Sequence, residues 1–223
     1  MTGRIIVTPF NTDTIISKPL TVKDDLITGY NIAPRNFVSI IKQGRHEIEL
    51  CKAYWGYTPH WLKVLENSPY LARCETLQDK AMFKKSLQQR CLIPVSGYYE
   101  WKQFTRQKQA YAVRRPENRI FFLAGIWTRY PTSDVTYYET FALLTIKSNR
   151  FIHNISERMP VVITEESVEE WLNSDNLDKP ESFLKPAAEQ HLDYYPVSAL
   201  VNNPDNGSRA VSEPNSKRFR FEQ

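Results

Sequence analysis

Short apolar runs separated by turn residues dominate the hydrophobic pattern of this chain. The clearest runs are Phe37–Ile41, Ile48–Trp55, Ile120–Trp127 and Tyr137–Ile146. Their length and their content of aromatic and β-branched residues favour strands over helices. The core is therefore predicted to be mainly β.

Helical patterns are fewer. Two segments each follow a threonine that can act as an N-cap, Leu77–Gln89 and Glu165–Leu172, and the second has two acidic residues in its first turn, where they interact favourably with the helix dipole. A third helix is expected near Glu181–Leu192. Pro186 is unfavourable inside it, because an interior proline removes a backbone donor and clashes with the preceding turn.

The length of 223 residues, with 41% hydrophobic and 13% aromatic content, is enough to bury the core of one domain over residues 1–223. From about residue 202 the chain is rich in Asn, Pro, Ser and Gly, which predicts an irregular C-terminal segment. The last seven residues, KRFRFEQ, form a short basic tail that we expect to be solvated.

Charge and cysteine content limit the classes of function that the chain can have. The 29 Lys+Arg against 25 Asp+Glu give a net charge of only +4, so any nucleic-acid-binding surface must be local. No long apolar run predicts a membrane span, and the N-terminus lacks the layout of a signal peptide. Three cysteines without C-x-x-C spacing argue against a disulfide framework and a zinc site. We expect a cytoplasmic protein with reduced, buried thiols and with no metal, cofactor or membrane partner.

A series of motifs in a fixed order covers nearly the whole chain. They are Met1-Thr2-Gly3-Arg4, Tyr30-Asn31-Ile32-Ala33-Pro34, WGYTPHW from Trp55, LARCET from Leu71, RCLIPVSGYYEW from Arg90, and ERMP from Glu157 with YPVS and VNN further on. In order and spacing these motifs resemble the SOS response-associated peptidase (SRAP) family, the abasic-site processing proteins. The run RCLIPVSGYYEW is the most specific of them.

The resemblance implies an α+β fold, a single compact domain with a mainly antiparallel sheet or barrel-like core and a few flanking helices. It also implies a thiol chemistry. In the family Met1 is removed and a cysteine at position 2 is left, whose α-amine condenses with the ring-opened aldehyde of an abasic site in single-stranded DNA. The thiol then closes onto the imine carbon to give a stable thiazolidine crosslink. An asparagine, a glutamate and a histidine complete the family's site.

Position 2 of this chain departs from the family, because it is Thr2. A hydroxyl is a weaker nucleophile than a thiol, whose pKa of about 8.5 leaves some thiolate at neutral pH. An imine still forms if Met1 is lost, since an α-amine with a pKa of about 7.7–8.0 is partly neutral in the cell. Closure by the hydroxyl gives an oxazolidine, which reverses more readily than the sulfur ring. We therefore expect no durable crosslink.

Two more positions of the family's site are changed. Leu71 stands where the family has its asparagine, and Ser156 stands where it has its histidine. An aliphatic side chain makes no hydrogen bonds, and a serine does not shuttle protons near neutral pH. His153 lies three residues earlier, which on an extended segment is a displacement of roughly 10 Å. We expect His153 to be a surface or packing residue.

Glu100 is the one catalytic residue type that stands where the family has it, and the resemblance implies that it protonates a leaving group. Its neighbours Tyr99 and Trp101 suggest partial desolvation, which favours the neutral carboxylic acid. A structural role as a hydrogen-bond partner is the alternative.

The residues that resemble the family's DNA contacts are retained. Three arginines resemble the phosphate-binding residues, two residues resemble the loop that approaches the nucleic acid, and one ring resembles the aromatic wedge for base stacking. They are Arg4, Arg73 and Arg158, then Asn31 and Pro34, and finally Trp61. Lys84, Lys85 and Arg90 extend this basic character, but lysines on one helix are usually only solvated, and we leave these three out of the site.

Three hypotheses follow. The first is a monomer that binds single-stranded or junction DNA, with or without an abasic site, and whose covalent chemistry is weakened or lost. The second is an active enzyme that uses the Thr2 amine and hydroxyl with Glu100 for autopeptidase, imine or lyase chemistry. The third is a protein-interaction module on the same fold. The retained arginines favour the first.

Overall fold

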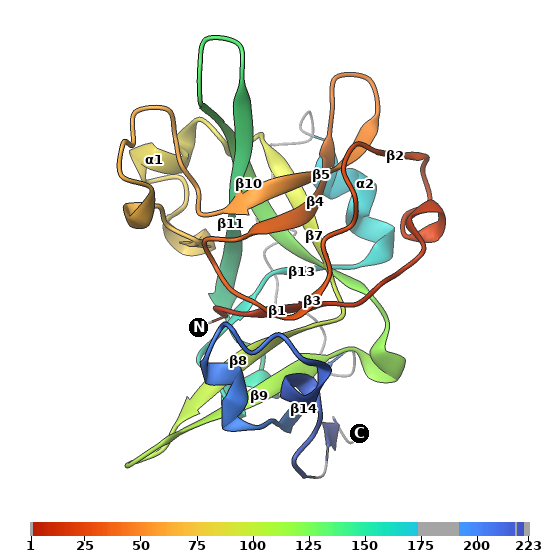
Figure 1. The fold of residues 1–223 in the computed structure, drawn as a ribbon, viewed down its shortest axis with the longest axis vertical. Helices are drawn as coiled ribbons and strands as arrows, with labels where there is room; N and C mark the ends of the chain where they lie inside the picture. The colour runs from red at the N-terminus through yellow and green to blue at the C-terminus, as the bar shows by residue number, and fades with distance from the viewer. Residues whose placement is uncertain (1, 174–191, 217, 221–223) are drawn as a thin grey trace.

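The computed structural model describes residues 2–173, 192–216 and 218–220, and a closed barrel of five strands forms its centre (Figure 1). The barrel strands are β4 (Phe37–Gln43), β5 (Ile48–Trp55), β7 (Arg90–Val95), β10 (Phe121–Pro131) and β11 (Tyr137–Lys147). Neighbouring strands are antiparallel in the order β11-β10-β7-β4-β5. The barrel closes where β5 pairs with β11 in parallel, with Trp55 opposite Phe141.

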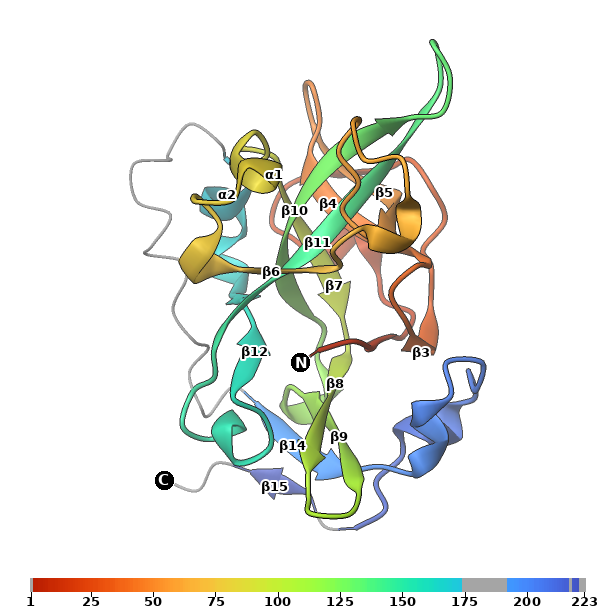
Figure 2. The same ribbon diagram turned by 90° about the vertical axis from the view of Figure 1, so that its left-hand side faces the viewer.

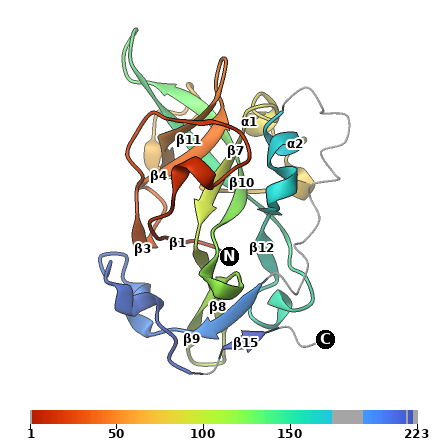
Figure 3. The ribbon, with the colours of Figure 1, turned by 90° about the vertical axis from the view of Figure 1, so that its right-hand side faces the viewer.

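The barrel strands are buried on both faces over most of their length. In β4, for example, every residue from Val38 to Lys42 is buried. One face of each strand points into the barrel, and the other is covered by loops and by the helix α2 (Val168–Leu172), which packs against β7 (Figure 3). This double burial explains why the strands appear in the sequence as nearly continuous apolar runs instead of alternating patterns.

Short strands extend the barrel sheet. They are β2 (Leu20–Val22) beside β5, β6 (Leu71–Arg73) and β12 (Arg158–Pro160) beside β11, and β13 (Val162–Ile163) beside β10. The strands β6 and β12 lie on opposite sides of β11, because Thr145 pairs with Arg73 on one side and Lys147 pairs with Arg158 on the other. Two candidate phosphate-binding arginines therefore flank the same end of β11.

A second sheet lies against one end of the barrel (Figure 2). Its strands, in spatial order, are β15 (Phe219–Arg220), β14 (Asp193–Pro196), β9 (Lys108–Arg114), β8 (Gly97–Gln103), β1 (Ile5–Val7) and β3 (Gly29–Ile32). The chain passes from β7 into β8 at Gly97, where a Cβ atom would come within 2.8 Å of the Val113 carbonyl oxygen. Only glycine fits such a close backbone approach, so Gly97 fixes the step from the barrel to the second sheet.

The C-terminal segment packs on the second sheet. It contains short 3-10 turns at Ala199–Asn202 and Arg209–Ser212. Val201 and Val211 are fully buried in a second apolar cluster with Tyr99 and other residues. Residues 219–220 of the basic tail are exposed, as expected, and they form the edge strand β15 beside β14.

The predicted fold class and the four predicted strands are confirmed. The predicted helix Leu77–Gln89 is wrong: the structure has only the short helix α1 (Ala81–Lys84) there. After α1 the N–H groups of Ser86 and Gln89 bond to carbonyls three residues earlier, so the chain continues as separate turns. Tertiary contacts hold these turns, since the Tyr57 hydroxyl lies 2.7 Å from the Ser86 hydroxyl oxygen.

The other helix predictions had different outcomes. The segment Glu165–Leu172 is helical, as a 3-10 turn over Glu165–Ser167 that leads directly into α2. The predicted helix Glu181–Leu192 lies, except for its last residue, outside the described residues. In the part of the chain that the structure describes, no helix has the length and apolar character needed to cross a membrane.

Candidate functional site

Thr2 and Glu100 form a buried pair, although 98 positions separate them in the sequence. Thr2 is 1% exposed and Glu100 is fully buried, and the Thr2 hydroxyl donates a hydrogen bond to Oε1 of Glu100. The register of β1 against β8 produces this contact. Ile5 pairs with Tyr98, and the Tyr99 N–H donates to the Arg4 carbonyl at 3.1 Å, so that the residues before Arg4 reach Glu100.

Burial controls the ionisation of Glu100. Desolvation raises the pKa of this carboxyl above its ordinary value, and the hydrogen bond from Thr2 opposes the rise without cancelling it. Ser156 also lies close enough to lower the pKa of Glu100. The neutral acid is therefore populated to a higher pH than in an exposed glutamate, which suits a proton donor.

The structure places the changed positions as follows. Ser156 lies near the Glu100 carboxyl, and its hydroxyl donates to the Arg158 carbonyl at 2.7 Å. Leu71, at the start of β6, is half-buried and packs against the barrel core. His153 is exposed on a 3-10 turn with Nδ1 3.3 Å from the Ser148 hydroxyl. The position that resembles the family's histidine is thus beside Glu100, but a serine occupies it.

A cleft of about 460 Å³ has among its lining residues Ser156, which lies near the Glu100 carboxyl. Its walls include Arg73, Trp101, His153, Ser156 and Arg158. Two of the three candidate phosphate-binding arginines therefore share one concave surface, which also has an aromatic ring and a neutral polar group. A surface of this kind can hold a phosphate and the adjoining sugar of a nucleic acid strand.

The two arginines of the cleft differ in their surroundings. Arg73 is exposed, whereas Arg158 is bound by Glu75 in a bidentate pair with N to O distances of 3.0 and 2.8 Å. Nη2 of Arg158 also donates to the Thr145 carbonyl at 2.7 Å. The Arg158 guanidinium lowers the pKa of the Glu75 carboxyl, which stays ionised and competes with any phosphate for this arginine.

Arg4 lies outside the cleft but is connected to it. Its Nη1 donates to the Gly3 carbonyl at 2.9 Å and its Nη2 to the Asn202 carbonyl at 3.4 Å. The Asn202 side chain in turn accepts a hydrogen bond of 2.7 Å from the indole nitrogen of Trp101, which lines the cleft. Burial lowers the pKa of the Arg4 guanidinium. Arg4 thus fixes the junction of the N-terminal and C-terminal segments at the edge of the cleft.

Asn31 is buried and faces the C-terminal segment. Its amide nitrogen lies 3.2, 2.9 and 3.1 Å from the carbonyl oxygens of Val201, Asn203 and Asn206. With its two N–H groups committed in this way, the amide holds the chain around Asn202 in place. Asn31 thereby positions the C-terminal segment at the edge of the cleft.

Pro34 and Trp61 lie on two connected turns. Pro34 begins the turn before β4, and the next residue, Arg35, has a positive φ of 75°. The Arg35 guanidinium donates to the Ser68 carbonyl at 2.6 Å, which ties this turn to the loop carrying Trp61. Trp61 is 54% exposed in a turn closed by the bond from the Leu62 N–H to the Pro59 carbonyl. Its ring is accessible for stacking.

The sequence did not single out three residues that line or support the candidate site: Trp101 in the cleft, Asn202, which is bonded to Trp101, and Arg35, which connects the turns of Pro34 and Trp61. Trp101 follows Glu100 in the GYYEW motif, and its position in the motif was the available signal. Asn202 belongs to the VNN motif, to which the sequence alone assigns no role. Nothing in the sequence indicated the connection made by Arg35, which depends on a left-handed backbone and on two loops meeting in space.

No cysteine is among the described residues that line the cleft. All three thiols are free, and burial raises the pKa of each, to about 12 for Cys74. Such thiols are poor nucleophiles near neutral pH, so they do not replace a thiol at position 2. Among the residues that the structure describes, no cluster of three or more His, Cys, Asp or Glu side chains could hold a metal ion.

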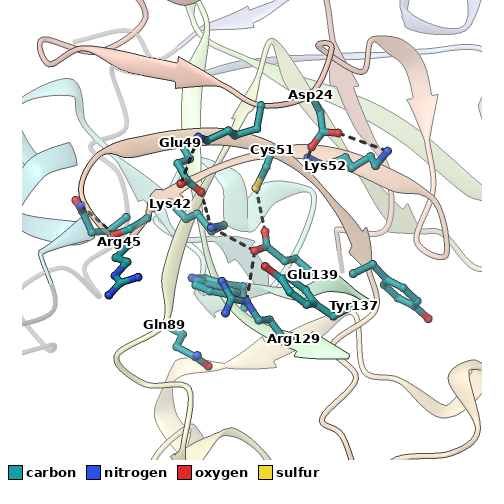
Figure 4. A pocket seen from close by; sticks show the side chains of 15 residues that line it. Asp24, Lys42, Arg45, Glu49, Cys51, Lys52, Gln89, Arg129, Tyr137 and Glu139 are labelled. Atoms are coloured by element: carbon teal, nitrogen blue, oxygen red, sulfur yellow. Dashed lines mark hydrogen bonds and ion pairs between the residues drawn. The ribbon is translucent and has the colours of Figure 1, made fainter. Parts of the chain in front are cut away.

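A larger cavity, of about 710 Å³, lies elsewhere, at one end of the barrel (Figure 4). Its floor is the Lys42 ammonium, which is 3.0 Å from Glu49 and 3.2 Å from Glu139. The Cys51 thiol donates to the other Glu139 oxygen at 2.9 Å. Burial acts to lower the pKa of Lys42, but the two carboxylates outweigh it and raise the pKa. Lys23 also lies 4.0 Å from Glu49 and Arg129 lies 3.9 Å from Glu139, so cations balance both carboxylates and the described lining residues of the cavity include no reactive group.

Sequence comparisons relate the chain to known proteins. The family profile described as SOS response associated peptidase (SRAP) matches residues 1–204. The abasic site processing protein YoqW of Bacillus subtilis is 36% identical over 192 residues, which cover 82% of this chain and 85% of that protein. The abasic site processing protein YedK of Escherichia coli is 26% identical over 89% of this chain and 90% of its own.

Solved structures show the same fold. A crystal structure of a protein from Bacteroides thetaiotaomicron superposes with a TM-score of 0.75 at 27% identity, covering 86% of this chain and 87% of that one. A protein from Bordetella bronchiseptica gives a TM-score of 0.74 at 18% identity, covering 88% and 99% of the two chains.

Proposed function

The chain belongs to the SOS response associated peptidase (SRAP) family, and from this premise we propose that it binds single-stranded or junction DNA and that its covalent chemistry toward abasic sites is weakened or lost, so that it makes no durable crosslink. Its relatives YoqW and YedK are named abasic site processing proteins. The observation that carries the proposal is the cleft in which Arg73 and Arg158 flank β11, beside the buried pair of Thr2 and Glu100.

Binding in this proposal rests on phosphate contacts. Arg73 is exposed and receives a phosphate directly, while Arg158 binds one after exchanging its Glu75 partner. Guanidinium groups match phosphate oxygens with two parallel hydrogen bonds. The exposed ring of Trp61 supplies a stacking platform on a separate turn, worth about 1–3 kcal/mol for each stacked base.

The covalent chemistry follows from Thr2 and Glu100. Once Met1 is removed, the Thr2 α-amine adds to the ring-opened aldehyde and water leaves, forming an imine. Glu100 supplies the proton for the departing hydroxyl, since burial favours its neutral form. The Thr2 hydroxyl then adds across the imine carbon, its proton passing to the nitrogen, to give an oxazolidine. With Leu71 and Ser156 in place of a hydrogen-bonding amide and a proton shuttle, this bond reverses.

The DNA-binding proposal is tested by measuring affinity for single-stranded DNA as a function of salt. We expect affinity to fall as salt rises, with a slope that decreases by about 0.7 for each phosphate contact removed, as in Arg73→Ala or Arg158→Ala. Arg119→Ala is the matched control, because Arg119 is exposed and forms an ion pair elsewhere, with Glu117. Binding that is absent, or insensitive to salt, contradicts the proposal.

A second candidate function, an active enzyme, is favoured by the hydrogen bond between Thr2 and Glu100. This function requires that the protein form an imine with abasic DNA. Borohydride should trap this imine, and the trapped product should be absent in Glu100→Gln. Glu157→Gln is the control, because Glu157 is an exposed carboxylate on the same cleft. If no species is trapped between pH 6 and 9 and DNA affinity is retained, the enzyme function is excluded and DNA binding is the remaining function.

A further inference from the structure

Another cavity, of about 470 Å³, lies between the turns that follow β6 and the helix α2, and it shares no described residue with the proposed DNA cleft. Its walls are mainly apolar and include Leu77, Leu87, Ile126, Leu144 and Trp171. Cavities of this size with apolar walls and a few polar groups are typical of small-molecule sites.

The buried charged side chain of this cavity is an arginine. Arg90, the first residue of β7, is only 3% exposed. Its Nε donates to the Leu87 carbonyl and its Nη1 to the Trp171 carbonyl, both at 3.3 Å, and its guanidinium carbon lies 5.0 Å from the centre of the Trp171 ring. Nη2 has no hydrogen-bond partner among the described residues. A buried cation with an unused donor has the capacity to bind an anion.

All charged side chains among the described lining residues of the cavity are positive. Lys84 and Lys85, both exposed, line its mouth, and no aspartate or glutamate is among its described lining residues. Burial lowers the pKa of the Arg90 guanidinium, and no carboxylate offsets this effect. The Lys42 cluster at the barrel end is different, because two carboxylates pair with that cation. The cavity therefore has an electrostatic preference for an anionic ligand.

We propose that this cavity binds a small organic carboxylate with an apolar body, such as an aryl or alkyl carboxylic acid. The carboxylate accepts the free Nη2 donor of Arg90, and the apolar walls cover the hydrocarbon part. A phosphate dianion fits less well, because it needs more donors than one buried guanidinium offers and the two lysines lie in solvent. This site is independent of the proposed DNA-binding function.

The test uses 4-phenylbutyrate as probe, with 4-phenyl-1-butanol as its neutral counterpart and inorganic phosphate as a competing anion. Binding to the full chain is followed by isothermal titration calorimetry. We expect the carboxylate to bind at least about tenfold more tightly than the alcohol, since hydrogen bonds to charged groups are the stronger ones. We expect phosphate not to displace it. Equal binding of the alcohol, or full displacement by phosphate, overturns the proposal.

Variants locate the site. The double variant Lys84→Glu, Lys85→Glu changes only exposed residues and is expected to weaken 4-phenylbutyrate binding about threefold, whereas the exposed control Lys108→Glu, on β9, leaves it unchanged. Arg90→Gln is expected to abolish binding. If that variant does not fold, Leu87→Trp blocks the cavity from a half-buried position instead. Undiminished binding in the double variant and in Leu87→Trp contradicts the assignment.

Discussion

Replacing Glu75 with glutamine provides a sharp test of how the cleft uses Arg158. The Glu75 carboxylate holds both terminal nitrogens of this guanidinium, at 3.0 and 2.8 Å, so a DNA phosphate must displace it. Glu75 is 42% exposed on its side chain, and an exposed pair of this kind contributes about 0.2–1 kcal/mol. Removal of the competing charge is therefore expected to strengthen DNA binding by about 1.5-fold to fivefold.

The salt dependence gives a second, independent measure of the same change. If Arg158 becomes available to one more phosphate, the slope of log affinity against log salt steepens by about 0.7 on single-stranded DNA. Fluorescence anisotropy with a labelled single strand between roughly 50 and 200 mM salt measures both quantities. In an Arg158→Ala background, Glu75→Gln is expected to bring much less gain, because the residue that it releases is missing.

The matched control is Glu117→Gln, which removes the same charge from an exposed ion pair with Arg119 elsewhere on the surface. It is expected to leave both affinity and slope nearly unchanged. The reasoning is refuted if Glu75→Gln weakens binding, or if its gain is the same with and without Arg158. Either result would mean that Glu75 holds Arg158 in its binding position and does not compete with DNA.

Three further predictions concern other parts of the site. Burial raises the pKa of Glu100, so the folded state favours its neutral form. This contribution to stability is complete below the ordinary carboxyl pKa of about 4.3 and is lost as pH rises through the raised value. In urea unfolding, the free energy of unfolding of Glu100→Gln should therefore rise relative to that of the original chain as pH increases from the ordinary to the raised pKa. A difference between the two chains that does not change with pH would contradict this prediction. Asn31→Ala should lower the free energy of unfolding in urea by about 1–3 kcal/mol, because it removes the donors to three backbone carbonyls; an unchanged midpoint would argue against this role. Trp61→Ala should weaken single-strand binding by about 1–3 kcal/mol with unchanged stability, whereas Tyr137→Ala, at an exposed ring away from the cleft, should not; equal effects of the two would remove the stacking role.

Local sequence pattern was sufficient for most of the sheet. The run Ile48–Trp55 is a strand over that same range, and Tyr137–Ile146 extends by a single residue in β11. Length and β-branched content identify such strands because both of their faces are buried. The pattern was insufficient at Leu77–Gln89, where tertiary hydrogen bonds to Tyr57 and successive short turns override a helical periodicity.

For the site, the sequence could predict only the residues that belong to motifs. Motif order indicated Glu100 and the arginines, but the contact between Thr2 and Glu100 depends on the register of β1 against β8, which no local pattern encodes. The pairing of Arg158 with Glu75 joins residues 83 positions apart. The burial of Asn31 likewise depends on where the C-terminal segment packs. These properties follow from long-range topology and not from spacing along the chain.

The central claim is that the N-terminal threonine makes no durable bond to abasic DNA. The most direct test is the intact mass of the protein after incubation with abasic single-stranded DNA and denaturation without a reductant. We predict the unmodified mass for the original chain, and a stable protein-DNA adduct for a variant with Thr2→Cys, Leu71→Asn and Ser156→His. A stable adduct on the original chain would contradict the account.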